Sequence, residues 1–92
     1  MLLITLLLLL LTPASAHETR TGWMYDNSCC AEHHCHPVDD GIVEDKRDGV
    51  AVMGFGLVPY NDSRLRWSRD NQDHVCSNGG LLLCVYRRFK GL

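Results

Sequence analysis

The chain has 92 residues, five cysteines and a formal net charge of −2, which argues against several domains and against a strongly basic, polyanion-binding domain. A domain of this size is near the lower limit at which a hydrophobic core alone stabilises a fold, so covalent crosslinks are expected. Acidic side chains predominate before residue 49 and basic ones after it. Two halves of opposite sign favour mutual packing or solvation, so we expect no nucleic-acid partner.

Residues 1–16 have the layout of a secretory signal peptide, with a leucine-rich run, the helix-breaking Pro13 and a small-residue tripeptide that ends at Ala16. The apolar run is shorter than the roughly 20 residues that cross a bilayer. We therefore expect cleavage after Ala16, a mature chain that begins at His17, and no membrane span in the mature form. Residues 17–92 would then form a single small domain in the periplasm or outside the cell, where cysteines form disulfides.

A short helical turn is predicted near the start of the mature chain. Asp26, Asn27 and Ser28 are residues that cap helices by accepting hydrogen bonds from unpaired backbone N–H groups. The turn should run from about Ser28 to His34, because Pro37 disfavours helical geometry at the preceding residue and lacks an N–H.

The middle of the chain predicts β structure. Apolar residues at 42–43 and 50–53 flank a polar stretch in which Asp48 and Gly49 form a good hairpin turn pair. Residues 57–60 should be extended, and Pro59 makes them an edge or crossing segment. Residues 61–73 are rich in polar side chains, so we expect a long surface loop that Trp67 anchors to the body of the domain.

A second hairpin, residues 74–76 with 81–86, is predicted around Asn78 and Gly79, the strongest turn signal in the sequence. With that two-residue turn, Cys76 lies opposite Leu81 and Cys84 points to the other face of the sheet, so these two cysteines should not bond to each other.

The partners of the two hairpin cysteines should therefore come from the early cluster. We expect one disulfide from Cys29 or Cys30 and a second from Cys35, with the other vicinal cysteine unpaired. The predicted fold is a small disulfide-stapled β-rich (α+β) domain of two β-hairpins with one short N-terminal helical turn. The cysteines available for its disulfides are Cys29, Cys30, Cys35, Cys76 and Cys84.

A metal site is the first alternative role for this segment. His34 and His36 flank Cys35, and a bridge from Cys35 to the hairpin would bring His74 near them, which would suit zinc or copper. The chain has no C-x-x-C or H-x-x-x-H spacing, so we expect no cofactor and keep zinc or copper binding as the alternative.

A catalytic role is not expected, because the chain has no G-x-S-x-G elbow, H-E-x-x-H helix or phosphate-binding loop. The unpaired cysteine beside histidines leaves a thiol redox role as a second alternative.

Several short motifs resemble a family of short exported proteins from alphaproteobacteria and some of their phages. The motifs are Tyr25-Asp26, Cys29-Cys30, Cys35 with Pro37-Val38, Val58-Pro59, His74-x-Cys76 and Cys84-x-Tyr86. The chain departs from that pattern at His34, where an acidic residue is usual, and at Arg87-Arg88, where small residues or proline are usual. The resemblance implies export and a shared arrangement of cysteines, and it indicates no particular activity.

The sequence as a whole predicts an exported non-catalytic module that binds another protein or an envelope component. The prediction rests on a stapled frame with a long loop that carries Arg, Asp and Trp side chains, and on the lack of a catalytic motif.

Overall fold

A computed structural model describes residues 19, 22–30 and 34–90 of the chain. The predicted signal peptide, residues 1–16, lies outside the described residues, and so does the predicted cleavage point. Within the described part, no helix has the length and apolar character needed to cross a membrane.

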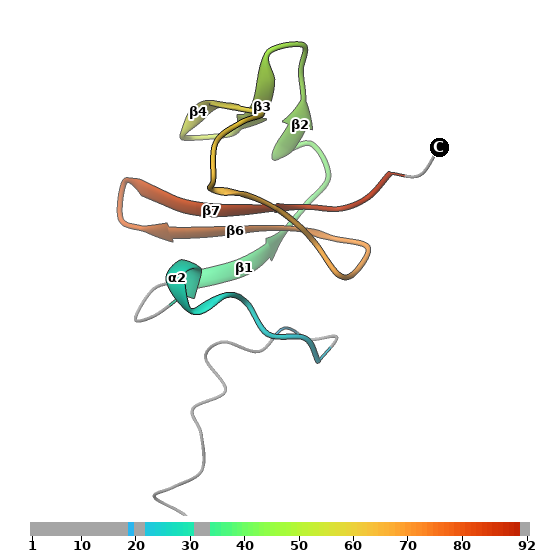
Figure 1. Ribbon diagram of the computed structural model, residues 1–92, viewed down its shortest axis with the longest axis vertical. Helices are drawn as coiled ribbons and strands as arrows, with labels where there is room; N and C mark the ends of the chain where they lie inside the picture. The colour runs from blue at the N-terminus through green and yellow to red at the C-terminus, as the bar shows by residue number, and fades with distance from the viewer. Residues whose placement is uncertain (1–18, 20–21, 31–33, 91–92) are drawn as a thin grey trace, which may run out of the picture.

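The fold has three layers, which Figure 1 shows nearly edge-on. A four-stranded sheet lies in the middle, a three-stranded sheet covers one of its faces, and an N-terminal segment that contains α2 (Asn27–Cys30) covers the other. The β-rich class, the short helical turn and the stapled frame agree with the sequence prediction. Two sheets replace the simpler pair of hairpins that the sequence predicted.

The four-stranded sheet has the order β1-β6-β7-β5. Its strands are β1 (His34–Val38), β5 (Leu65–Trp67), β6 (Asp73–Asn78) and β7 (Leu81–Arg87). The pairs β1·β6 and β6·β7 are antiparallel, whereas β5 runs parallel to β7. Side chains alternate across this sheet, so His74 and Cys76 face the N-terminal segment, and Val75 between them faces the small sheet.

The three-stranded sheet is an antiparallel meander of β2 (Val43–Asp45), β3 (Gly49–Val52) and β4 (Gly56–Pro59). The β4 strand is an edge, as Pro59 predicted. The predicted turn at Asp48 and Gly49 is shifted by one residue, because Asp45 pairs with Val50 and the backbone N–H of Lys46 donates to the carbonyl of Gly49 at 2.8 Å.

Gly49 is a glycine for a reason that the turn prediction missed. It does not have the positive φ of a turn glycine. It lies in β3, where a Cβ atom would sit 2.3 Å from the carbonyl oxygen of Val58 on β4. Close contact between two strands therefore requires glycine here.

The main apolar core lies between the two sheets. The small sheet contributes Val43, Val50, Val52 and Val58, and the large sheet contributes Val75, Leu82 and Val85. All of these side chains are almost completely buried. In the small sheet, the apolar side chains that face this core alternate along each strand with side chains that face outward.

Two disulfides join the early cysteine segment to the last hairpin, as the sequence predicted. Cys29 of α2 bonds to Cys84 of β7, and Cys35 of β1 bonds to Cys76 of β6. The two bridges use four of the five cysteines, so Cys30 has no cysteine left in the chain with which to pair.

The register of the second hairpin was predicted wrongly, although the pairing of its cysteines was not. The turn is Gly79-Gly80, with Asn78 opposite Leu81 and a positive φ of 60° at Gly79. A register shift follows Cys76, with Ser77 opposite Leu82, and places Cys76 directly opposite Cys84. An extra residue in one strand, Leu83, returns Cys84 to the face of Cys76. Each cysteine nevertheless bonds to the N-terminal part of the chain.

Two further predictions need correction. His34 does not end the helical turn but begins β1, an edge strand that forms backbone hydrogen bonds with β6 on one side. Residues 61–73 are not all loop, because Leu65, Arg66 and Trp67 form β5 beside β7. Leu65 packs against the main core, whereas Trp67 is 58% exposed and does not anchor the segment.

Candidate binding surface

A buried polar chain lies between the large sheet and the N-terminal segment. His74 on β6 is 1% exposed, and its Nδ1 lies 2.8 Å from the hydroxyl of Tyr25. Its Nε2 lies 2.8 Å from Oδ1 of Asp70, in the turn that precedes β6. An ionised carboxylate only accepts hydrogen bonds, so Nε2 is the donor, and in the neutral ring Nδ1 accepts the hydroxyl proton of Tyr25.

Asp70 is the centre of this polar chain. Burial disfavours its ionised form, but hydrogen bonds from the His74 ring, the Trp23 indole and its own loop outweigh burial and hold the pKa of Asp70 well below its usual range. The Trp23 indole donates to Oδ2 at 2.9 Å. Within the loop, the Ser68 hydroxyl and the Gln72 backbone N–H both approach Oδ1. Asp70 therefore joins the 68–72 loop to the N-terminal segment.

A second polar group fixes the same segment beside Tyr86 of β7. The Tyr86 hydroxyl donates to Asp26 at 3.0 Å and accepts from the Asp26 backbone N–H at 2.9 Å. Burial and the nearby Asp26 carboxylate raise the pKa of Tyr86 to about 12. Arg66 of β5 completes the group, with an ion pair to Asp26 at 2.7 Å.

The Tyr25, His74 and Asp70 chain has the connectivity of a proton relay. Its terminal residue, Tyr25, is only 4% exposed, and its ring lies 5.2 Å from that of Trp23 and 5.4 Å from that of Tyr86. The Tyr25, His74 and Asp70 hydrogen bonds tie the N-terminal segment to β6 and the 68–72 loop, and we call these three residues the polar clasp. Buried polar groups of this kind must be hydrogen-bonded to be tolerated.

The histidines proposed as metal ligands are not brought together. His34 and His36 are exposed and share one face of β1, whereas His74 is buried on the opposite face of the sheet. Both ring nitrogens of His74 already have partners. Among the residues that the structure describes, no three His, Cys, Asp or Glu side chains are grouped so as to hold a metal ion.

Both disulfides lie in the inner cluster with Tyr25 and Tyr86, where Cys29, Cys76 and Cys84 are almost completely buried. The Sγ of Cys35 is 3.6 Å from the carbonyl oxygen of Cys29, so the two bridges are close neighbours. They are structural crosslinks in this position. A thiol redox role would have to use Cys30, the cysteine outside both bridges.

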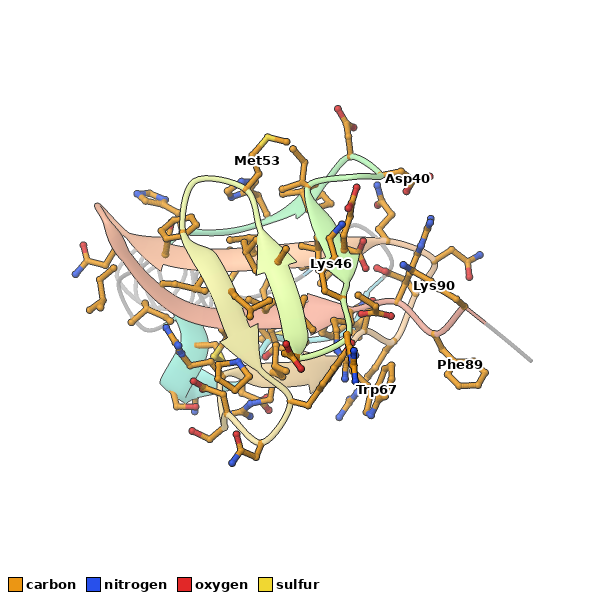
Figure 2. The ribbon with its side chains drawn as sticks, turned by 90° about the horizontal axis from the view of Figure 1, so that it is seen from above. Asp40, Lys46, Met53, Trp67, Phe89 and Lys90 are labelled. Carbon is orange, nitrogen blue, oxygen red and sulfur yellow. A yellow bond between two sulfur atoms is a disulfide. The ribbon has the colours of Figure 1, made fainter. Side chains whose placement is uncertain are left out.

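Exposed aromatic side chains gather around Arg87 at the end of β7. We call Tyr60, Trp67, Arg87 and Phe89 the aromatic–arginine patch. The guanidinium of Arg87 lies over the Trp67 ring at 4.4 Å and near the Tyr60 ring at 5.5 Å from the centroid. Phe89 meets Trp67 edge to face, with 6.0 Å between the ring centroids. Figure 2 shows Trp67, Phe89 and Lys90 together at one end of the molecule.

The three aromatic side chains of the patch are exposed, whereas the Arg87 side chain is only 15% exposed. Trp67 is 58% exposed, Phe89 68% and Tyr60 45%. The Tyr60 hydroxyl donates to the carbonyl of Lys46, and Arg87 donates to Asp45 at 3.3 Å. The Nε of Arg87 is buried and, among the described residues, has no hydrogen-bond partner.

A polar hollow of about 390 Å³ adjoins the patch and shares Phe89 with it. The hollow lies between the 68–72 loop and the segment that follows β7, and its lining is Asn71, Arg88, Phe89 and Lys90. Arg88 pairs with Asp40 at 2.7 Å, and Lys90 approaches Asp45 at 4.0 Å. An amide, two cations and an aromatic ring thus face one space.

A second, more apolar hollow lies on the outer face of the small sheet. Ala51, Met53 and Leu57 line it, together with Ile42, and the Glu44 side chain lies at it too. Glu44 pairs with Lys46 at 2.9 Å, which lowers the pKa of Glu44 and raises that of Lys46. Figure 2 shows Met53 well away from Trp67 and Phe89.

The sequence analysis missed the aromatic–arginine patch because its members come from three separate segments. Tyr60 follows β4, Trp67 ends β5, and Arg87 and Phe89 belong to the end of the chain. The alternation of Leu65, Arg66 and Trp67 predicts a short strand, but it places Trp67 on the same face as the core residue Leu65 and so gives no signal that Trp67 is exposed.

Comparison of the chain with protein families, curated proteins and solved structures finds no significant match. The function therefore has to be argued from the geometry of this chain alone.

Proposed function

We propose that this chain is an exported, non-catalytic binding module that docks on a partner protein of the cell envelope through the aromatic–arginine patch. Two disulfides in a small domain suit an oxidising compartment, and the leucine-rich run with its small-residue end suits export. The short exported proteins that the chain resembles would share that compartment.

One observation carries the proposal. Three exposed aromatic rings lie close together at the end of β7, with Arg87 stacked on Trp67 and near Tyr60, and Phe89 against Trp67. Two disulfides and the polar clasp hold the domain that carries them. Trp, Tyr and Arg are the residues that dominate binding energy at protein interfaces, chiefly when they are clustered. A side chain that is already ordered loses less conformational entropy when a partner binds.

The proposal can be tested with a photo-crosslinking amino acid at Phe89 in the full chain expressed in its host. The control places the same amino acid at Met53, because the two side chains are 68% and 66% exposed but lie on different parts of the surface. We expect a discrete protein adduct from position 89 and none from position 53. Excess unlabelled protein should compete the adduct away, whereas excess Trp67→Ala protein should not.

Equal adducts from the two positions, no adduct from position 89, or competition by the Trp67→Ala protein would each refute docking through the patch. Far-ultraviolet circular dichroism of the variant shows whether it keeps its fold. It should do so, because an exposed side chain of this kind contributes little to stability.

A further inference from the structure

We propose that the part of the partner that docks beside the patch is an acidic peptide segment with an aromatic or apolar side chain. Its carboxylates would sit in the hollow lined by Asn71, Arg88, Phe89 and Lys90, and its apolar side chain would lie against Phe89 and Trp67. This inference rests on the function proposed above and names the chemistry of the partner.

The walls of the hollow are already tied to each other. The backbone N–H of Ser68 donates to the carbonyl of Arg87 at 2.7 Å, and the backbone N–H of Arg88 donates to Asp73 at 2.7 Å. On the loop side, Asp70 accepts the backbone N–H of Gln72 at 2.9 Å. A hollow with fixed walls binds a ligand without first paying to order them.

The charged side chains that line the hollow are both cations. Among the described residues, the lining contains Arg88 and Lys90 and no carboxylate. Their acidic partners lie outside the lining, because Arg88 pairs with Asp40 and Lys90 approaches Asp45. Arg69, in the 68–72 loop, is exposed and makes no ion pair with any residue that the structure describes. A guanidinium binds a carboxylate well because its fork of N–H donors matches the two oxygens.

The same surface argues against a long polyanion. Asp40 is 76% exposed and Asp45 is 46% exposed in their side chains, so both present negative charge beside the hollow. A nucleic-acid backbone or an anionic bilayer would meet these acids as well as the cations, and like charges at close range are repelled. One or two carboxylates on a peptide can lie between the cations and avoid the acids.

The test is a titration of the oxidised protein with two blocked peptides, followed by amide chemical shifts. One peptide carries two aspartates beside a phenylalanine, and the other has asparagine in place of each aspartate. We expect the acidic peptide to bind about fivefold or more tightly than the asparagine peptide at low ionic strength, with the shifts centred on residues 67–71 and 87–90. Salt should weaken the binding, since exposed charges are screened.

Three variants sharpen the test. Arg88→Gln should lower the affinity for the acidic peptide by about fivefold. Asp40→Asn should raise that affinity by about twofold, because this variant removes the carboxylate that competes for Arg88 within the protein. Arg47→Gln is the matched control, an exposed arginine of the β2–β3 turn with no described ion pair, and should leave the affinity unchanged.

Equal binding of the two peptides, or weaker binding by the Asp40→Asn protein, would overturn the acidic-peptide assignment. So would tighter binding of single-stranded DNA or of vesicles with anionic phospholipid at the same residues. Any of these results leaves the crosslinking result at Phe89 untouched, so the failure of this inference can be told apart from failure of the proposed function.

Discussion

Removal of the Cys29–Cys84 bridge tests how the fold holds its N-terminal segment. The bridge closes a loop of 55 residues, and the Cys35–Cys76 bridge closes one of 41. In the chain-entropy model each bridge alone would contribute about 4 kcal/mol. The second loop lies inside the first, however, so with the Cys35–Cys76 bridge intact the Cys29–Cys84 bridge closes only about 15 residues and contributes about 3 kcal/mol. Cys29 and Cys84 are also almost completely buried, so alanine at both positions should cost about 1 kcal/mol more in lost packing.

We therefore expect Cys29→Ala/Cys84→Ala to lower the free energy of unfolding by about 4 kcal/mol, a large part of the stability of a small domain. The matched variant, Cys35→Ala/Cys76→Ala, should lose a similar amount. Both belong in a Cys30→Ala background, which prevents the spare thiol from forming a replacement bridge. Urea unfolding of the oxidised proteins, followed by circular dichroism and tryptophan fluorescence, gives the free energies.

Two outcomes would refute this reasoning. A loss below about 1 kcal/mol would mean that the unfolded chain is not restrained by the bridge, so that the polar clasp and packing hold the segment. A difference of more than about 2 kcal/mol between the two variants would mean that local effects, and not loop length, set the contribution of each bridge.

Two other predictions concern single residues. The lowered pKa of Asp70 means that folding favours its ionised form, so its contribution to the free energy of unfolding is present above the unfolded pKa of about 3.9 and is lost as the pH falls below that value. Asp70→Asn should therefore reduce the loss of stability at acid pH, measured by urea unfolding curves at a series of pH values. An unchanged pH dependence would contradict the assignment. Gly49→Ala should destabilise the domain by about 1–3 kcal/mol, because the new Cβ would overlap the carbonyl of Val58. The control is Gly80→Ala, where the added atom meets nothing within 4 Å. Equal thermal midpoints for the two variants would show that the strands β3 and β4 separate at little cost.

Much of the frame follows from local chemistry in the sequence. The capping residues before Cys29 predict a helical turn, and Pro59 predicts an edge strand. Each of these two depends on a few neighbouring residues, which is why it can be predicted without the fold. The prediction that the hairpin cysteines bond to the early cluster was also confirmed, but the register on which it rested was wrong, because Cys76 lies directly opposite Cys84.

Other features depend on contacts between distant segments. The strand β1 gains its backbone partners from β6, and β5 gains its partners from β7, more than 15 residues away in each case. Neither segment has a strong periodic pattern of its own, so their strand character is decided by pairing. The extra residue Leu83 changes the register of the hairpin in a way that no turn motif announces.

The candidate surface is the clearest example of what only the tertiary structure decided. The sequence by itself determined a small, cysteine-rich, β-rich domain, because composition and short-range patterns set the size of the core and the need for crosslinks. It made Trp67 the anchor of a surface loop and grouped His74 with His34 and His36. Strand pairing decided otherwise for His74, since the alternation of side chains along β6 turned it inward to Asp70. Trp67 shares a face with the core residue Leu65, but it ends β5 and remains exposed against Arg87.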